Sequence, residues 1–262
     1  MKKVFRKIIG LVMAATFAVS AFSVSKIDAK AATSINVNQE YRLTLKYGEV
    51  AEYTFTTLSD AVTNVSAAIV GGNSFTGAGM KLTVDYCNYD SGYIFPGEGR
   101  RVSENFVFAP GKTATLKFDS VGYGDTVDIA FTVNCSNPGN LEKESNNSPA
   151  SATQIKLKKV YNGIVTYEGS DTDWYVFKAP KTGKYKFYAV NTMTDGYTMV
   201  LCEGFKSKTK KDTGFSSYLM AGSGWAHSKS VKLKKGKKYY IKFSGASYEK
   251  SIPVQIRVKK VK

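Results

Sequence analysis

The residue types that commonly carry catalysis are scarce in this sequence. His227 is the only histidine among the 262 residues, which excludes an H-E-x-x-H zinc site and any centre built from several histidines. No G-x-S-x-G motif is present. The tripeptide 212–214 (DTG) resembles an aspartic-protease signature, but two lysines precede it and its composition predicts a loop. We therefore expect a protein that is not an enzyme, with a hydrolase built on carboxylates distant in sequence as the alternative.

The three cysteines, Cys87, Cys135 and Cys202, offer little further chemistry. An odd number cannot form a closed disulfide framework, and the spacing matches no Cys-x-x-Cys metal motif. Cys87 and Cys135 both fall in the first half of the chain, and the sequence leaves open whether they pair. Cys202 follows an apolar run and is expected to be a small buried hydrophobe.

Strands must position any site that the chain contains. Several short segments alternate apolar and polar residues, are rich in Val, Ile, Thr, Tyr and Phe, and are separated by turns: 53–55, 113–118, 127–133, 174–177, 239–243 and 254–258. No convincing 3.6-residue periodicity accompanies them, so the chain is predicted to be all-β. The region 134–151 is rich in Asn, Ser, Pro and Gly. We expect a linker at 138–151 between domains at 33–137 and 152–262.

The two halves repeat one pattern. A shift of 125 residues places 108–118 on 233–243, with Gly111 on Gly236 and Phe118 on Phe243. Nearer the start of each half, a shift of 122 places Tyr53 on Tyr175. The alignment keeps the inward alternation of apolar residues, which indicates a duplication with a diverged first copy.

The first 31 residues have the pattern of an export signal. Residues 1–7 are basic, an apolar run extends from Ile8 to about Val24, and 29–31 (AKA) offers small residues where a signal peptidase cleaves. We expect residues 1–31 to be removed and the protein to be secreted, either free or associated with the cell surface. The apolar run is short for a membrane span, and no transmembrane anchor is expected.

The charge of the chain is unevenly distributed. The formal net charge is +16, of which residues 32–140 carry −4 and residues 141–262 carry +15. Lysine-rich runs occur at 206–211, 232–238 and 259–262. An exported basic surface meets anionic wall polymers or acidic glycans, and no nucleic-acid-binding module is recognisable. We expect a salt-sensitive affinity for such polymers and no nucleic acid partner.

The second half resembles the bacterial pre-peptidase C-terminal domain, the family that includes the collagen-binding domains of collagenases. The resemblance is carried by an acidic entry, by an aspartate-containing hairpin and by a closing strand: 142–147 (EKESNN), 163–165 (GIV) with 169–177 (GSDTDWYVF), and 236–241 (GKKYYI). It covers residues from about 141 to about 260 and implies a jelly-roll-like β-sandwich. The family pattern has proline where this chain has Ser145 and often aspartate where it has Asn147.

The resemblance also implies a calcium site, with ligands drawn from the acidic entry and the hairpin: Glu142, Glu144, Asn146, Asn147, Asp171 and Asp173. Calcium prefers six to eight hard oxygen ligands with several carboxylates among them, which this set supplies. An ordinary solvated linker followed by a turn is the alternative, since Asp and Asn also initiate turns.

A ligand-binding face is predicted from alternation near the C-terminus. If Ile241 and Ile256 point into the core with their neighbours two residues away, the outward residues are Tyr240, Lys242, Gln255 and Arg257. Tyrosine and arginine contribute strongly to interfaces. We therefore expect a secreted, calcium-stabilised protein that binds an extracellular polymer, which is a protein fibre, a glycan or cell wall, through its second domain. An accessory or pro-domain-like partner of a secreted protease is the alternative.

Overall fold

The computed structural model of the chain describes residues 32–84, 87–122, 126–166, 171–194, 197–245 and 251–262. Within these ranges the secondary structure consists of strands and turns without a helix, which confirms the all-β prediction. The described part accordingly contains no helix long and apolar enough to cross a membrane. The predicted signal segment, 1–31, lies outside the described residues.

The first half forms a sandwich of two sheets. One sheet has the strand order β1-β3-β9-β5-β6, and the other has the order β2-β10-β4-β7 with β8 also paired to β4. Its strands are β1 (Thr33–Ser34), β2 (Glu40–Lys46), β3 (Val50–Thr56), β4 (Val62–Gly72), β5 (Thr76–Val84), β6 (Cys87–Ile94), β7 (Arg101–Val102), β8 (Phe106–Val107), β9 (Thr113–Gly122) and β10 (Thr126–Ser136).

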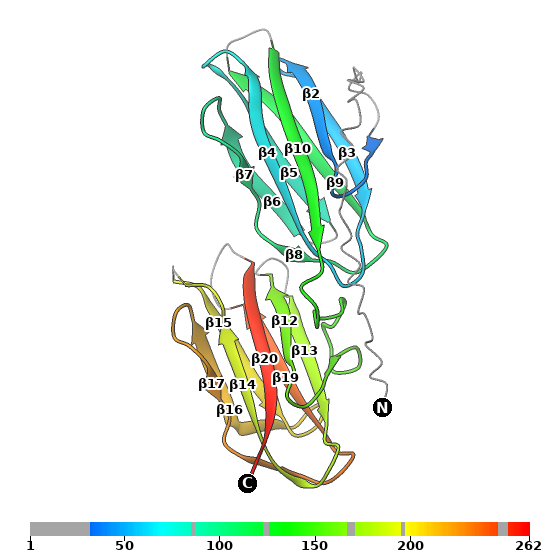
Figure 1. Ribbon diagram of the computed structural model, residues 1–262, viewed down its shortest axis with the longest axis vertical. Helices are drawn as coiled ribbons and strands as arrows, with labels where there is room; N and C mark the ends of the chain where they lie inside the picture. The colour runs from blue at the N-terminus through cyan, green and yellow to red at the C-terminus, as the bar shows by residue number, and fades with distance from the viewer. Residues whose placement is uncertain (1–31, 85–86, 123–125, 167–170, 195–196, 246–250) are drawn as a thin grey trace, which may run out of the picture.

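The second half forms another two-sheet sandwich, which follows the first end to end (Figure 1). One sheet has the order β11-β13-β19-β15-β16, and the other has the order β12-β20-β14-β17 with β18 also paired to β14. Its strands are β11 (Thr153–Ile155), β12 (Val160–Val165), β13 (Thr172–Lys178), β14 (Gly183–Asn191), β15 (Met199–Phe205), β16 (Lys211–Met220), β17 (Ala226–His227), β18 (Val231–Leu233), β19 (Lys238–Gly245) and β20 (Ile252–Val261).

The two sandwiches have the same strand order, as a duplication predicts, because each strand of the second sandwich occupies the place of the strand ten numbers earlier in the first. The turns repeat as well. Gly111 and Gly236 both have positive φ, at 75° and 80°, a conformation that glycine adopts without a steric cost. The Gly111 N–H donates to Thr57 O, and the Gly236 N–H donates to the equivalent Ala179 O.

The alternation of apolar and polar residues along the strands explains how the core of each sandwich is formed. In β9 the buried residues Ala114, Leu116 and Phe118 alternate with less buried ones, as a strand with one core-facing side requires. The core of the second sandwich contains Ile241 and Ile256, together with the other residues predicted to point inward: Phe243, Val254 and Val258.

The two sandwiches touch through a small apolar cluster. Val107 of the first sandwich packs with Leu141 and Ile164, and the half-buried Val62 joins them. The predicted linker at 138–151 is thus partly a packed element. The polar composition of this segment predicted an exposed linker. The prediction missed the packing because the few residues that point inward stand among exposed polar neighbours.

One further expectation changes. The tripeptide at 212–214 lies within strand β16 and not in a loop, although only its Asp212 pairs with β15 before the register shifts. Cys135 is a free cysteine whose Sγ lies 3.4 Å from Thr63 Oγ1. The side chain of Cys87, whose pairing with Cys135 the sequence leaves open, lies outside the described part of the structure. Cys202 is fully buried in the core, as predicted.

Candidate metal centre

The segment 141–147 is held by backbone contacts to two neighbouring strands. Leu141 forms a parallel bridge with Asn162 of β12. On the other side, the Trp174 N–H of β13 donates to Asn146 O at 2.9 Å. The segment therefore lies between the starts of β12 and β13, and its side chains can reach the end of the sandwich core.

Strand β13 carries an aspartate into that same end of the core. Asp173 alternates with Tyr175 and Phe177, and all three are buried inside the sandwich. Asp173 lies opposite Phe243 of β19 and is fully buried. A strand position that normally holds an apolar residue thus holds a carboxylate.

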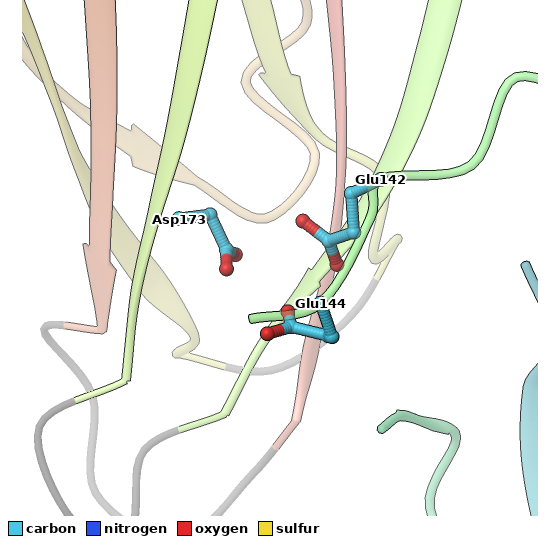
Figure 2. Close-up of side chains that lie close together, drawn as sticks. All are labelled: Glu142, Glu144 and Asp173. Carbon is cyan, nitrogen blue, oxygen red and sulfur yellow. The ribbon is translucent and has the colours of Figure 1, made fainter. Parts of the chain in front are cut away.

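Three carboxylates meet at this point. Glu142, Glu144 and Asp173 each offer one oxygen, and these oxygens all lie within 4.8 Å of one another. Figure 2 shows the three side chains turned toward a common space between the 141–147 segment and β13. Asp171 and Asn146, both buried, lie beside this group. We refer to these five residues as the acidic cluster.

Only part of the acidic cluster is satisfied by hydrogen bonds. Glu142 Oε1 accepts from the Ile164 N–H at 2.6 Å, and Glu142 Oε2 accepts from Tyr175 Oη at 2.6 Å and Asn146 Nδ2 at 3.1 Å. Buried oxygens without a hydrogen-bond partner come from the other members: Glu144 Oε2, Asn146 Oδ1, Asp171 Oδ1, Asp173 Oδ1 and Asp173 Oδ2. Buried polar atoms are almost always paired, so this concentration of unpaired acceptors marks a site that lacks a positive partner.

Burial and mutual repulsion disfavour the ionised state of these groups. Burial raises the pKa of Glu142 to about 7, against the hydrogen bonds from Tyr175 and Ile164. Burial and the charges of Glu142 and Asp171 raise the pKa of Glu144 to about 9. The pKa of Asp173 is raised well above its ordinary value, by burial first and by the neighbouring carboxylates next. At neutral pH the cluster therefore needs either protons or a cation.

The donor set fits a hard divalent cation. It consists of carboxylate and amide oxygens, which calcium, magnesium and manganese prefer, and it contains no nitrogen or sulfur ligand. The unpaired oxygens belong to residues of two chain segments, 141–147 and 171–173. An ion bound by these oxygens would therefore link the two segments.

The first sandwich shows that the fold does not require an aspartate at the position of Asp173. Ala51 occupies the place of Asp173, two residues before Tyr53, just as Asp173 precedes Tyr175. Ala51 is buried against the core, so the same strand position is filled there by an apolar side chain. The carboxylate at this strand position therefore distinguishes the second sandwich from the first.

One glycine makes the close approach possible. A Cβ added at Gly163 would lie 2.0 Å from Tyr175 Oη and 2.7 Å from Glu142 Oε2. The hydroxyl and the carboxylate thus occupy the space that a side chain would fill. Tyr175 was not among the predicted site residues, and its position two residues after Asp173, on the same side of β13, was the available signal.

The structure brings together five of the six predicted ligands: Glu142, Glu144, Asn146, Asp171 and Asp173. Asn147 is the exception, because it is exposed and its backbone oxygen accepts a hydrogen bond from Thr172 Oγ1 at 3.3 Å. Asp171 Oδ2 accepts from the Thr166 N–H at 2.9 Å, and burial raises its pKa to about 6. Gly169 and Ser170, which were part of the predicted hairpin, lie outside the described residues.

The predicted binding face is wrong as a single surface. Tyr240 and Lys242 belong to β19, whereas Gln255 and Arg257 belong to β20, and these strands lie in different sheets of the sandwich. Their outward sides are therefore on opposite faces. Tyr240 is also only 4% exposed, because it packs in a small cluster with Trp174 of the neighbouring strand.

The outer face of the β12-β20-β14-β17 sheet gathers aromatic and basic side chains. The Arg257 guanidinium lies 4.1 Å from the ring centroid of Trp225 and 5.3 Å from that of Tyr188. Lys259 Nζ lies 5.3 Å from the Tyr188 ring, which also contacts the ring of His227. We call these five residues the aromatic face. Sequence reasoning missed Trp225 and Tyr188 because neither is near β20 in the chain.

Comparisons with known proteins identify no family. No family model matches the chain, and no curated protein matches it. The resemblance to the pre-peptidase C-terminal domain therefore stays a prediction, while the expected sandwich architecture is present.

Solved structures give general likenesses. Tripeptidyl peptidase 2 is 8% identical with a TM-score of 0.32, covering 86% of this chain and 24% of that one, so the chain spans about a quarter of its length. The tandem CBM22-1–CBM22-2 domains of Paenibacillus barcinonensis Xyn10C are 8% identical with a TM-score of 0.25, covering 79% and 82%. The PBSX exported protein XepA is 8% identical with a TM-score of 0.25, covering 86% and 88%. At these scores, the fold assignment rests on the strand order of the chain itself.

Proposed function

We propose that this chain is an exported, non-catalytic binding protein whose second sandwich holds calcium in the acidic cluster and captures an extracellular polymer on the aromatic face. The observation that supports the metal most strongly is the set of buried oxygens without partners around Glu144 and Asp173. A protein that left these charges uncompensated would lose stability through their desolvation, and a divalent cation removes that cost.

Calcium suits the cluster better than magnesium for a chemical reason. Calcium accepts six to eight oxygens in irregular arrangements, whereas magnesium demands near-ideal octahedral geometry and retains its waters. The acidic cluster offers several side-chain oxygens from a crossing segment and a strand. Bound calcium would tie Glu144 of that segment to Asp173 of β13 and make the end of the sandwich rigid.

The aromatic face supports polymer capture by its composition. Tryptophan, tyrosine and arginine are the residues that contribute most at interfaces. Outward positions of this sheet also carry Lys184 and Lys186, which precede Tyr188 on the same side of β14. Among the described residues, no acidic side chain occupies the outward positions of β12, β14, β17, β18 or β20. The face is therefore adapted to a neutral or anionic ligand.

Polymer capture can be tested with matched variants on opposite faces. The chain without residues 1–31 would be mixed with insoluble collagen, chitin and cell wall, with calcium or with a chelator, and the bound fraction measured. Trp225→Ala and Arg257→Ala should each reduce capture by about tenfold, since truncation of a central interface residue commonly costs 1 to 2 kcal/mol. Lys242→Ala, on the opposite face, is the control and should retain capture. Equal capture by all three variants on every polymer would refute the assignment of this face.

A further inference from the structure

Lysines from several turns and strand ends of the second sandwich line one cleft. The cleft has a volume of about 720 Å³ and is lined by residues from the turn before β16 and its start, from β18 with the residues on either side of it, and from the start of β19. Strand β16 is the edge of one sheet, and β18 pairs with the outermost long strand of the other. The cleft thus lies along the open side of the second sandwich, away from the acidic cluster between the 141–147 segment and the start of β13.

The lining of this cleft is strongly cationic. Six lysines line it, against one aspartate: Lys206, Lys229, Lys232, Lys234, Lys237, Lys238 and Asp212. We call this site the lysine cleft. All six lysines are exposed, so their ammonium groups are available to a ligand.

The single aspartate of the lysine cleft is already engaged. Asp212 Oδ2 accepts a hydrogen bond from Tyr239 Oη at 2.9 Å, and Asp212 Oδ1 accepts one from the Gly214 N–H at 3.0 Å. Lys206 Nζ lies 3.5 Å from Asp212 Oδ1. Burial raises the pKa of Asp212, but these contacts together lower it below its ordinary value, so the residue stays ionised and offsets one lysine only.

The shape and chemistry of the lysine cleft favour a chain of negative charges over a single anion. Its volume is several times that of one phosphate or sulfate group, and its ammonium groups are spread over three chain segments. Lysine acts as a mobile point charge, which suits repeated anionic groups without fixed bidentate geometry. The lining includes no aromatic side chain on which a nucleic-acid base could stack.

We propose that the lysine cleft binds an anionic polysaccharide, whose sulfate, carboxylate or phosphodiester groups contact the lysines. This site is separate from the aromatic face and does not depend on it. The second sandwich would then hold a polymer by two chemistries, with stacking on one sheet and charge pairing along the open edge.

The experiment compares two triple variants of equal charge. Lys229, Lys237 and Lys238 of the cleft would be changed to Gln in one protein. In the control, the same change is made at three exposed lysines in the turn before β12, at the opposite edge of the sheet: Lys156, Lys158 and Lys159. Binding of heparin, polygalacturonate and a phosphodiester-linked wall polymer would be measured by calorimetry at about 50 mM and about 200 mM salt.

The cleft variant should lose about tenfold or more in affinity at low salt, and its affinity should depend less on salt, because each exposed charge contributes modestly and the effects add. The control triple should stay within about twofold of the unmodified protein. Trp225→Ala should keep its affinity for soluble polyanions, so failure of the aromatic face and failure of the lysine cleft are distinguishable. The preferred polyanion identifies the anionic group.

Three results would overturn the proposal. Equal losses in the two triples would show that diffuse charge, and not the cleft, attracts the polymer. An unchanged affinity in the cleft variant would remove the site. Tighter binding of an oligothymidylate than of any glycan would assign the cleft to nucleic acid. Thermal unfolding of each variant confirms that its fold is retained.

Discussion

Replacing Glu144 by glutamine separates the two ways in which the acidic cluster can be neutralised. Glutamine resembles the protonated acid in shape but carries no charge at any pH. Without a cation the change should stabilise the second sandwich, because glutamine does not have to take up a proton at this buried position when the protein folds. With calcium the change should abolish most of the stabilisation by the metal, because a carboxylate ligand is lost.

The magnitude follows from the pKa of Glu144, which burial and the neighbouring carboxylates raise to about 9. A group whose pKa is raised in the folded state favours folding below its unfolded pKa, and this contribution is lost as the pH rises through the folded value. Between its unfolded value near 4.5 and about pH 7.5, the loss is up to about 4 kcal/mol. For the roughly 120 residues of the second half, Glu144→Gln should therefore raise Tm in chelator by up to about 15 °C.

Calcium should act in the opposite direction on the unmodified protein. At a concentration of about one hundred times its dissociation constant, a ligand that binds only the folded state contributes about 2.7 kcal/mol, or about 10 °C in Tm for a unit of this size. Glu144→Gln should lose most of that shift. Glu144→Gln should therefore be more stable than the unmodified protein in chelator, but calcium should stabilise it less.

Tryptophan fluorescence is the assay of choice, because the two tryptophans of the chain, Trp174 and Trp225, both lie in the second half. Melting curves of the chain without residues 1–31 would be recorded from about pH 4.5 to about pH 8.5, with calcium and with chelator. The Tm values of the unmodified protein and of the variant should become equal toward about pH 4.5. Glu52→Gln, an exposed change in the first half, is the matched control. A variant that is less stable in chelator at neutral pH, or that keeps the full calcium shift, would refute the reasoning.

Three other changes probe the packing around the sites. Gly163→Ala should destabilise the second sandwich by about 2 kcal/mol in urea unfolding, because the added Cβ displaces the Tyr175 hydroxyl; an effect below about 0.5 kcal/mol would contradict the close approach. Tyr240→Ala should cost about 3 kcal/mol, whereas Tyr218→Ala, at a residue 59% exposed, should cost little, and equal costs would argue against the buried position of Tyr240. Cys202, fully buried with a pKa raised by burial, should resist a thiol reagent until the sandwich unfolds, as mass spectrometry of the labelled protein would show.

Alternation predicted the strands well because it reports directly on burial. The inward positions of β19 and β20 are apolar at every second residue, and Ile241 and Ile256 are buried as expected. Resemblance to a family, and not spacing, also predicted the residues that form the acidic cluster. Glu142 and Asp173 are 31 positions apart, and only the crossing of the 141–147 segment between two strands brings them together.

Alternation could not show which sheet each strand joins. Strands β19 and β20 follow one another in sequence and read like the two arms of a hairpin. In the structure the chain passes from one sheet to the other between them, so Tyr240 and Arg257 emerge on opposite sides. Alternation also failed for Tyr240 itself, because its outward side is covered by apolar neighbours from other segments, among them Ala152.

The acidic cluster shares its backbone with the joint between the sandwiches. Ile164 packs against Val107 of the first sandwich, and its N–H donates to the carboxylate of Glu142. Leu141, the residue just before Glu142, belongs to the same apolar contact. We therefore expect the binding of a cation or a proton at Glu142 to affect this contact between the two sandwiches as well. Small-angle scattering of the protein with calcium and with chelator would measure the effect.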